Sequence, residues 1–233
     1  MPRPLRPIDD HLVYHVINRG NNRAPVFHDD EDYAAFLRAI GDLKQRRPFA
    51  FYGYCLMPNH IHLLIRPLET PISRLMQSLL VSHTQRYHRR HQSGGHVWQG
   101  RFKSPVIQDD DHLLTVLRYI EANPLRARMV AAAGEYRWSS FAAHGLGHLD
   151  PLLDSIAEYE ALAKTPRTRR RRWSAFVHQT PSDEELAAIR RSCSSGLPFG
   201  ASPWVEDLST RLGLDLTIRP RGRPRKTPAA PGP

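Results

Sequence analysis

Along the first 125 residues, apolar positions repeat with two different periods, and these periods predict the elements of one domain. Residues 11–18 alternate between two faces as a strand does, with Leu12, Tyr14 and Val16 on one side. Residues 49–57 are aromatic and β-prone, and residues 60–65 resume as a second strand after Pro58 and Asn59. Because the break between these two strands is so short, we expect a hairpin.

Helical spacing predicts the elements between and after these strands. Apolar residues recur at helical spacing in three further segments, residues 33–43, 72–87 and 113–120. Acidic residues 29–32 and 109–111 can cap two of these helices. With a short strand expected within residues 102–108, the order becomes β, α, β, β, α, β, α. That order matches an α+β fold with a ferredoxin-like antiparallel sheet, βαββαβ, and a last helix outside it.

The pattern changes after about residue 150, where helical pieces at 157–163 and 183–191 flank a basic run at 167–172. Residues 219–226 then hold five cations among Pro and Gly, a composition that cannot pack a core. We therefore expect a catalytic domain at 1–149, a smaller, looser and mostly helical region at 150–218, and a disordered basic tail at 219–233.

Composition favours a polyanionic partner. Lys and Arg number 33 against 23 Asp and Glu, and nucleic acid is a likelier target for such a surface than an acidic membrane. No run reaches the roughly 18 apolar residues of a membrane span, and the first residues lack the apolar part of a leader. A cytoplasmic, nucleoid-associated protein is expected. The two cysteines, Cys55 and Cys193, indicate neither a disulfide framework nor a paired-cysteine metal site.

Two histidines with a spacing of two suggest a metal site. In a strand, His60 and His62 share one face while Ile61 occupies the other, so both rings can reach one ion. Imidazole suits borderline divalent metals. The alternative, two partly buried histidines satisfied by hydrogen bonds, stays open on this evidence alone.

Tyr119 lies on a different side of its predicted helix from the apolar residues. On a helical wheel it falls about 110° from the centre of the apolar stripe, so it is not placed as a core tyrosine. Asn123 follows one turn later on the same flank, and Pro124 limits the helix. A phenol and an amide could therefore share a site, although an isolated pair of this kind is more often structural.

Five motifs together resemble a known family. They are Tyr-His-Val with Asn-Arg-Gly at 14–20, Tyr-Cys-Leu-Met-Pro-Asn-His-Ile-His-Leu-Leu at 54–64, Trp-Gln-Gly-Arg-Phe-Lys at 98–103, Arg-Tyr-Ile-Glu-Ala-Asn-Pro at 118–124 and Tyr-Arg-Trp-Ser-Ser at 136–140. In order and spacing they resemble the REP-associated tyrosine transposases, relatives of the small HUH-type transposases of IS200-like elements. The resemblance covers about the first 145 residues.

The resemblance implies a function and roles for the residues above. It implies an HUH nuclease with a metal site at His60 and His62, completed at the position of Asn123, where related transposases carry Gln. The metal would be Mg²⁺ or Mn²⁺, and Tyr119 would be the nucleophile. The product would be a 5′-phosphotyrosine with a free 3′-OH. The implied partner is single-stranded DNA, folded as hairpins of repetitive extragenic palindromes, and the working unit is a monomer or a homodimer.

Cations mixed with aromatic residues are typical of grooves that hold single strands. The candidates for DNA contact in the first domain are Arg19, Arg86, Arg89, Arg90, Trp98, Arg101, Phe102, Lys103 and Arg118. In the tail, Arg221, Arg223 and Arg225 resemble an AT-hook core that could enter a minor groove. A core Trp and Phe beside a solvated charged face, and a solvated basic tail, are the alternatives.

Two other functions share parts of this pattern. Histidine-triad hydrolases need a third histidine where this chain has Leu64, so that class is set aside. A regulator that grips DNA hairpins without cutting them remains the alternative, and the presence of His60, His62 and Tyr119 together argues against it.

Overall fold

A computed structural model describes residues 12–216 and places four strands in one antiparallel sheet. The strands are β1 (Val13–Arg19), β2 (Phe49–Met57), β3 (His60–Pro67) and β4 (Val106–Ile107), in the order β2-β3-β1-β4. This is the ferredoxin-like order that the sequence predicts, and the α+β fold class is confirmed. The hairpin is also present, because β2 pairs directly with β3.

The register of the sheet fixes which side chains share a face. On β1, Ile17 lies opposite His62 and Arg19 lies opposite His60. Alternate residues of a strand point to opposite faces, so His60 and His62 share a face with His15 of β1. Tyr14 and Val16, which are fully buried, occupy the other face.

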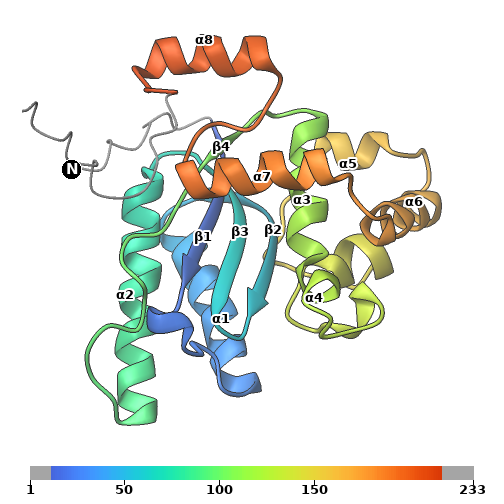
Figure 1. Ribbon diagram of the computed structural model, residues 1–233. Coiled ribbons are helices and arrows are strands. Elements are labelled where there is room, and N and C mark those ends of the chain that lie inside the picture. Colours follow the sequence, from blue (N-terminus) through green and yellow to red (C-terminus); the bar gives the residue numbers. More distant parts are fainter. Residues whose placement is uncertain (1–11, 217–233) are drawn as a thin grey trace, which may run out of the picture.

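Two helices, α1 (Asp30–Arg46) and α2 (Ile72–His91), cover that second face. The side chain of Asp29 caps α1 by accepting hydrogen bonds from the backbone of Glu31 and Asp32, as the acidic cluster predicted. In Figure 1, α1 lies behind the strands while α7 crosses in front of them. The face that carries the histidines is therefore the one that α7 covers.

Helix α3 (Asp111–Glu121) packs beside β2 and is followed at once by the short α4 (Asn123–Arg126). Its apolar residues are buried, and it packs closely over the glycine at position 53 of β2. A Cβ there would lie 2.3 Å from Leu117 Cδ1, so the Leu117 side chain would have to shift. The close approach brings α3, and with it Tyr119, against the sheet.

The chain beyond residue 126 begins with two short helical turns, η2 (Ala133–Glu135) and η3 (Ala142–Leu146). It continues as helices α5 (Ala157–Ala161), α6 (Pro166–His178), α7 (Asp183–Ser195) and α8 (Ser202–Leu212). Residues 167–172, expected as a basic run, lie inside α6. None of the helices among residues 12–216 is long and apolar enough to cross a membrane.

A buried carboxylate ties this C-terminal part to α3. Glu121 at the end of α3 is fully buried and accepts hydrogen bonds from Trp173 Nε1 at 2.7 Å and from Ser140 Oγ at 2.6 Å, while its Oε1 also lies 2.6 Å from His144 Nδ1. A charge buried at this depth is tolerated only with such partners. Trp173 itself belongs to the same core as the sheet. The division at residues 149 and 218 stays a prediction.

Candidate functional site

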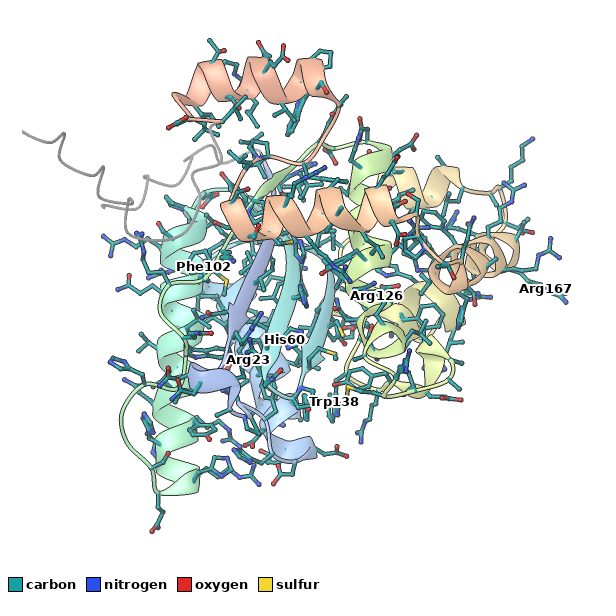
Figure 2. All side chains as sticks on the ribbon, viewed as in Figure 1. Arg23, His60, Phe102, Arg126, Trp138 and Arg167 are labelled. Carbon is teal, nitrogen blue, oxygen red and sulfur yellow. The ribbon has the colours of Figure 1, made fainter. Side chains whose placement is uncertain are left out.

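The predicted metal ligands line one cavity on the face of the sheet that α7 crosses. Its volume is about 740 Å³, and Figure 2 marks His60 on this face between β1 and α4. We call it the histidine cavity. It is lined by Ile17, Asn18, Arg19, Arg23, His60, His62, Gln99, Arg101, Lys103, Tyr119, Asn123, Arg190, Cys193 and Ser194. All four residues predicted to carry the chemistry, His60, His62, Tyr119 and Asn123, are thus brought together.

Both imidazoles are held in the form that a metal requires. His60 Nδ1 lies 2.7 Å from Asn59 Oδ1, and His62 Nδ1 lies 2.9 Å from His15 Nε2. Burial lowers the pKa of His60 to about 4 and that of His62 well below its ordinary value, so both rings are neutral at pH 7. No hydrogen bond within residues 12–216 involves Nε2 of either ring. The Nε2 atoms are therefore the ones left to bind an ion, in the tautomer that carries the ring proton on Nδ1.

His15 is a site residue that sequence reasoning missed. It is fully buried, and it stands between His62 and Cys193, whose Sγ lies 3.6 Å from His15 Nδ1. Burial, with the charge of Arg126, lowers its pKa to about 3. The signal was present in the Tyr-His-Val motif at 14–16. Only the pairing of β1 with β3, however, shows that His15 lies beside His62.

Tyr119 lies edge-on to the histidines. Its ring centroid is 5.9 Å from that of His62 and 6.0 Å from that of His15. Burial and the neighbouring Cys193 raise the pKa of the Tyr119 phenol, while the charges of Arg126 and Arg190 act in the opposite direction. The phenol is therefore protonated at neutral pH in the protein alone, and two cations are placed to favour its ionised form.

Arg126 is a second residue that sequence reasoning missed. Its guanidinium carbon lies 4.0 Å from the centre of the Tyr119 ring, and its Nη2 donates to the Tyr119 carbonyl at 2.6 Å. Its Nη1 is buried and has no hydrogen-bond partner among residues 12–216. Burial lowers the pKa of this arginine. The helix is interrupted between α3 and α4, and this interruption places Arg126 over Tyr119. Helical spacing alone does not predict that placement.

Asn123 caps α3 with one end of its amide. Its Nδ2 donates to the carbonyls of Tyr119 and Ile120, each at 3.0 Å. No residue from 12 to 216 donates to Oδ1, which leaves this oxygen as the atom able to bind a cation. Within the same residues, no three His, Cys, Asp or Glu side chains lie together as a metal site. A third protein ligand would therefore be an amide, from Asn123 or from Gln99.

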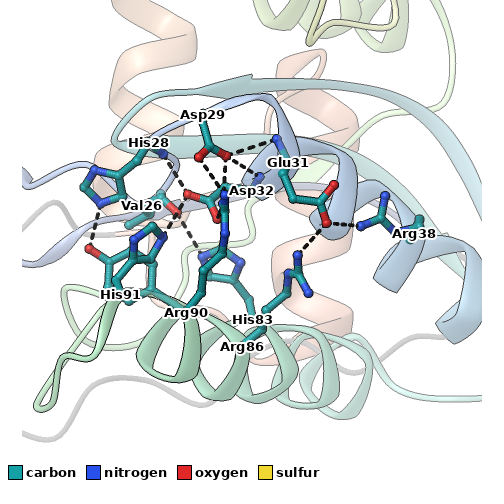
Figure 3. Close-up of polar contacts among 11 residues, drawn as sticks. Val26, His28, Asp29, Glu31, Asp32, Arg38, His83, Arg86, Arg90 and His91 are labelled. Carbon is teal, nitrogen blue, oxygen red and sulfur yellow. Dashed lines mark hydrogen bonds and ion pairs between the residues drawn. The ribbon is translucent and has the colours of Figure 1, made fainter.

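The predicted DNA-contacting cations divide into two groups. Arg19, Arg101 and Lys103 line the histidine cavity, where Arg23 and Arg190 join them. In contrast, Arg86 pairs with Glu31, and Arg90 pairs with Asp29 and Asp32, so both tie α2 to α1 (Figure 3). Arg89 is exposed and lies outside the cavity lining. These ion pairs argue against DNA contact by Arg86 and Arg90, because carboxylates already neutralise them, and their assignment stays a prediction.

Burial limits how three further predicted residues can act. Phe102 is only 7% exposed and belongs to the core, so its ring offers no open face to a base. Trp98 is 8% exposed and its ring packs against His83, so only its edge can face a neighbouring hollow. Arg118 is 3% exposed and pairs with Glu185 of α7, and its guanidinium carbon lies 4.1 Å from the centre of the Phe176 ring. It therefore connects α3 to α6 and α7 inside the protein. The tail residues Arg221, Arg223 and Arg225 lie outside the described residues.

Comparison with known proteins shows which proteins this molecule is similar to. Residues 9–123 match the family described as "Transposase IS200 like". A Haemophilus influenzae protein provisionally named a REP-associated tyrosine transposase is 30% identical over 119 residues. That alignment covers 46% of this chain and 66% of the relative, slightly less than two thirds of its length.

A solved structure described as a REP-associated tyrosine transposase bound to a REP hairpin matches with a TM-score of 0.54 at 19% identity. The match covers 68% of this chain and 93% of that one, and it supports the fold. Over residues 9–123 the chain is therefore similar to the IS200-like transposases. The two relatives named above are REP-associated tyrosine transposases, the family that the five sequence motifs resemble.

Proposed function

We propose that the chain is a metal-dependent endonuclease and strand transferase that acts on single-stranded DNA hairpins through Tyr119. The observation that carries this proposal is the histidine cavity, which joins the phenol, two neutral imidazoles and an amide to five cationic side chains. Its lining includes no carboxylate that would repel a phosphate. A nucleophile, a place for a cation and a binding surface for a polyanion therefore coincide.

The chemical step is a transesterification. Tyr119 Oη forms a bond to phosphorus, the bond from phosphorus to the 3′ oxygen breaks, and the proton lost by the phenol is balanced by the one that the 3′ oxygen gains. The product is a 5′-phosphotyrosine and a free 3′-OH, so a second 3′-OH can reverse the reaction without an external energy source. Arg126 and Arg190 support this step, because both favour the ionised phenol.

The cavity fits a divalent cation, Mg²⁺ or Mn²⁺. His60 and His62 would hold it through Nε2, and Asn123 through Oδ1. Their fit rests on two observations, the neutral state of both rings and the hydrogen bonds that occupy their Nδ1 atoms. When bound, such an ion supplies positive charge that polarises the phosphodiester and offsets the charge that develops there.

The partner is inferred from the relatives and from charge. The similar solved structure holds a REP hairpin, and we propose hairpins of the same class for this chain. Arg19, Arg101 and Lys103 would contact phosphates at the cavity, with affinity that falls as salt rises. Side chains from β1, β3, α3 and α7 of one chain line the cavity, which supports a monomer as the working unit.

Incubation of a labelled single-stranded hairpin with the protein and Mn²⁺ tests the proposal. We expect a covalent protein–DNA adduct that Tyr119→Phe abolishes while hairpin affinity stays unchanged. Tyr87→Phe is the matched control, because Tyr87 lies on α2 away from the histidine cavity, and it should form the adduct normally. Binding without any adduct in the wild-type protein would instead favour the hairpin-binding regulator.

A further inference from the structure

A second hollow adjoins the histidine cavity on the α2 side of the sheet. We call it the α2 groove. Its volume is about 660 Å³, and its walls include Leu80, Val81 and Thr84 of α2 and Val97 and Trp98 of the loop before β4. It shares Asn18, Gln99 and Arg101 with the histidine cavity. A ligand in one hollow can therefore continue into the other.

Two hydrogen-bond donors in the wall of the groove lack partners. Asn18 is 4% exposed and Trp98 is 8% exposed, and neither Asn18 Nδ2 nor Trp98 Nε1 has a hydrogen-bond partner among residues 12–216. Asn18 Oδ1 accepts from the Arg19 backbone at 3.0 Å, which leaves the amide NH₂ as the free end. A buried donor without an acceptor is unfavourable and rare in native proteins. Both nitrogens are closed off from solvent, so an acceptor on a bound molecule would satisfy them only after the Asn18 and Trp98 side chains shift.

The chemistry of the walls selects the kind of molecule. Apolar side chains and the rim of an indole suit a flat, weakly polar ring, and the free donors suit carbonyl oxygens at its edge. The lining contains no Asp or Glu, and Arg101 stands where the groove meets the histidine cavity. A nucleobase attached to a phosphate backbone has these properties. Its phosphate would lie on the cationic side and its ring on the apolar side.

We propose that the α2 groove holds an unstacked nucleobase of the strand that is cleaved in the histidine cavity. This inference rests on the proposed function and adds to it a seat for one base next to the reacting phosphodiester. Asn18 and Trp98 then act as the donors that contact the base edge. Discrimination between bases at that position would follow from which carbonyl oxygens each base presents.

The experiment measures hairpin affinity with the full-length Tyr119→Phe variant, which cannot cleave. A single abasic nucleotide is placed in turn at each unpaired position of the hairpin, and the adduct formed by the wild-type protein locates the scissile bond among them. One position, or two neighbouring ones, should weaken binding about tenfold, the usual scale for one stacked base. Equal affinity at every abasic position would overturn the groove proposal.

A matched pair of substitutions assigns the effect to the groove. Val81→Glu adds a negative charge to the groove wall, and Ser82→Glu adds the same charge to the neighbouring exposed residue outside the lining. Val81→Glu should weaken binding to the intact hairpin and remove the abasic effect, whereas Ser82→Glu should preserve it. An abasic effect that persists in Val81→Glu would place the base elsewhere and contradict the proposal.

The same samples separate this inference from the proposed function. Wild-type protein that forms the adduct but shows no abasic effect refutes only the groove. An abasic effect without any adduct supports the groove and refutes cleavage by Tyr119. Absence of hairpin binding by every variant overturns both.

Discussion

Two regions of this molecule concentrate arginines, and they use them in opposite ways. Between α1 and α2, Arg86 and Arg90 are paired with Glu31, Asp29 and Asp32. Around the histidine cavity, Arg19, Arg101 and Arg190 make no ion pair with any carboxylate among residues 12–216. The same side chain stabilises the fold where acids neutralise it, and it offers a binding surface where none is present. Sequence composition alone cannot make this distinction.

The largest effect on the rate of adduct formation is expected for Arg126, which acts on the nucleophile itself. Arg126→Met removes the charge over the Tyr119 ring and the cation that favours its ionised form. Adduct formation should slow by about 100-fold, the usual scale for loss of one preorganised charge-stabilising group, with little change in hairpin affinity. Single-turnover adduct rates measure this. The control is Arg171→Met on the exposed side of α6, for which a comparable loss would contradict the account.

Arg101 should affect binding and leave stability unchanged. Arg101→Ala removes a cation that pairs with no carboxylate in the described part of the chain, so hairpin affinity at low salt should fall several-fold. The slope of log affinity against log salt should become shallower by about 0.7 for each lost contact with a single strand. Fluorescence anisotropy across a salt series gives both values. An unchanged slope would show that Arg101 does not contact phosphate.

Arg90 should behave in the reverse manner. Arg90→Ala removes the partner of Asp29 and Asp32, so we expect a lower Tm and unchanged hairpin affinity for the folded protein. Thermal unfolding followed by circular dichroism, with anisotropy on the same sample, compares the two properties. A variant with normal Tm and weakened binding would reverse the division between the two regions.

Acid should lower the free energy of unfolding through His83 of α2, as pH falls from 6.5 to about 4. Burial lowers the pKa of His83 to about 4 from 6.5, although its Nε2 lies 3.1 Å from the Val26 carbonyl. The unfolded chain therefore binds this proton more readily than the folded chain. The contribution of neutral His83 to the free energy of unfolding is complete above pH 6.5 and is lost as pH falls towards 4. Its size is roughly 3 kcal/mol from the shift in pKa. His83→Gln should flatten the dependence of the unfolding free energy on pH in that range, and an unaltered profile would contradict this.

The fold of the first 121 residues could be predicted because its main elements have clear local signals, whereas α6 and α8 were not predicted. The alternation in residues 11–18, the break at Pro58 and Asn59, and the caps at Asp29 and Asp110 each reflect neighbouring residues only. Pro124 predicts that α3 ends there, but nothing in the sequence pattern predicts the short helix α4 that follows. Element order then leaves few ways to build the sheet.

The site was predictable only in part, because its remaining residues depend on contacts far apart in sequence. His60, His62 and Tyr119 came from motifs, yet His15 joins them only through the β1–β3 register. Arg190 and Cys193 come from α7, which no local pattern places over the sheet. The burial of Arg118 and Phe102 likewise depends on how separate elements pack. Charge and aromatic content therefore predict a class of partner, whereas they do not predict which residues line the cavity.

Peptide mapping by mass spectrometry of the adduct between the wild-type protein and a hairpin tests the central claim most directly. The account predicts that the 5′ end of the cleaved strand is found on the peptide that contains Tyr119, and that chelation of divalent cations prevents its formation. DNA attached to any other tyrosine, or an adduct that forms equally well in the chelator, would contradict it.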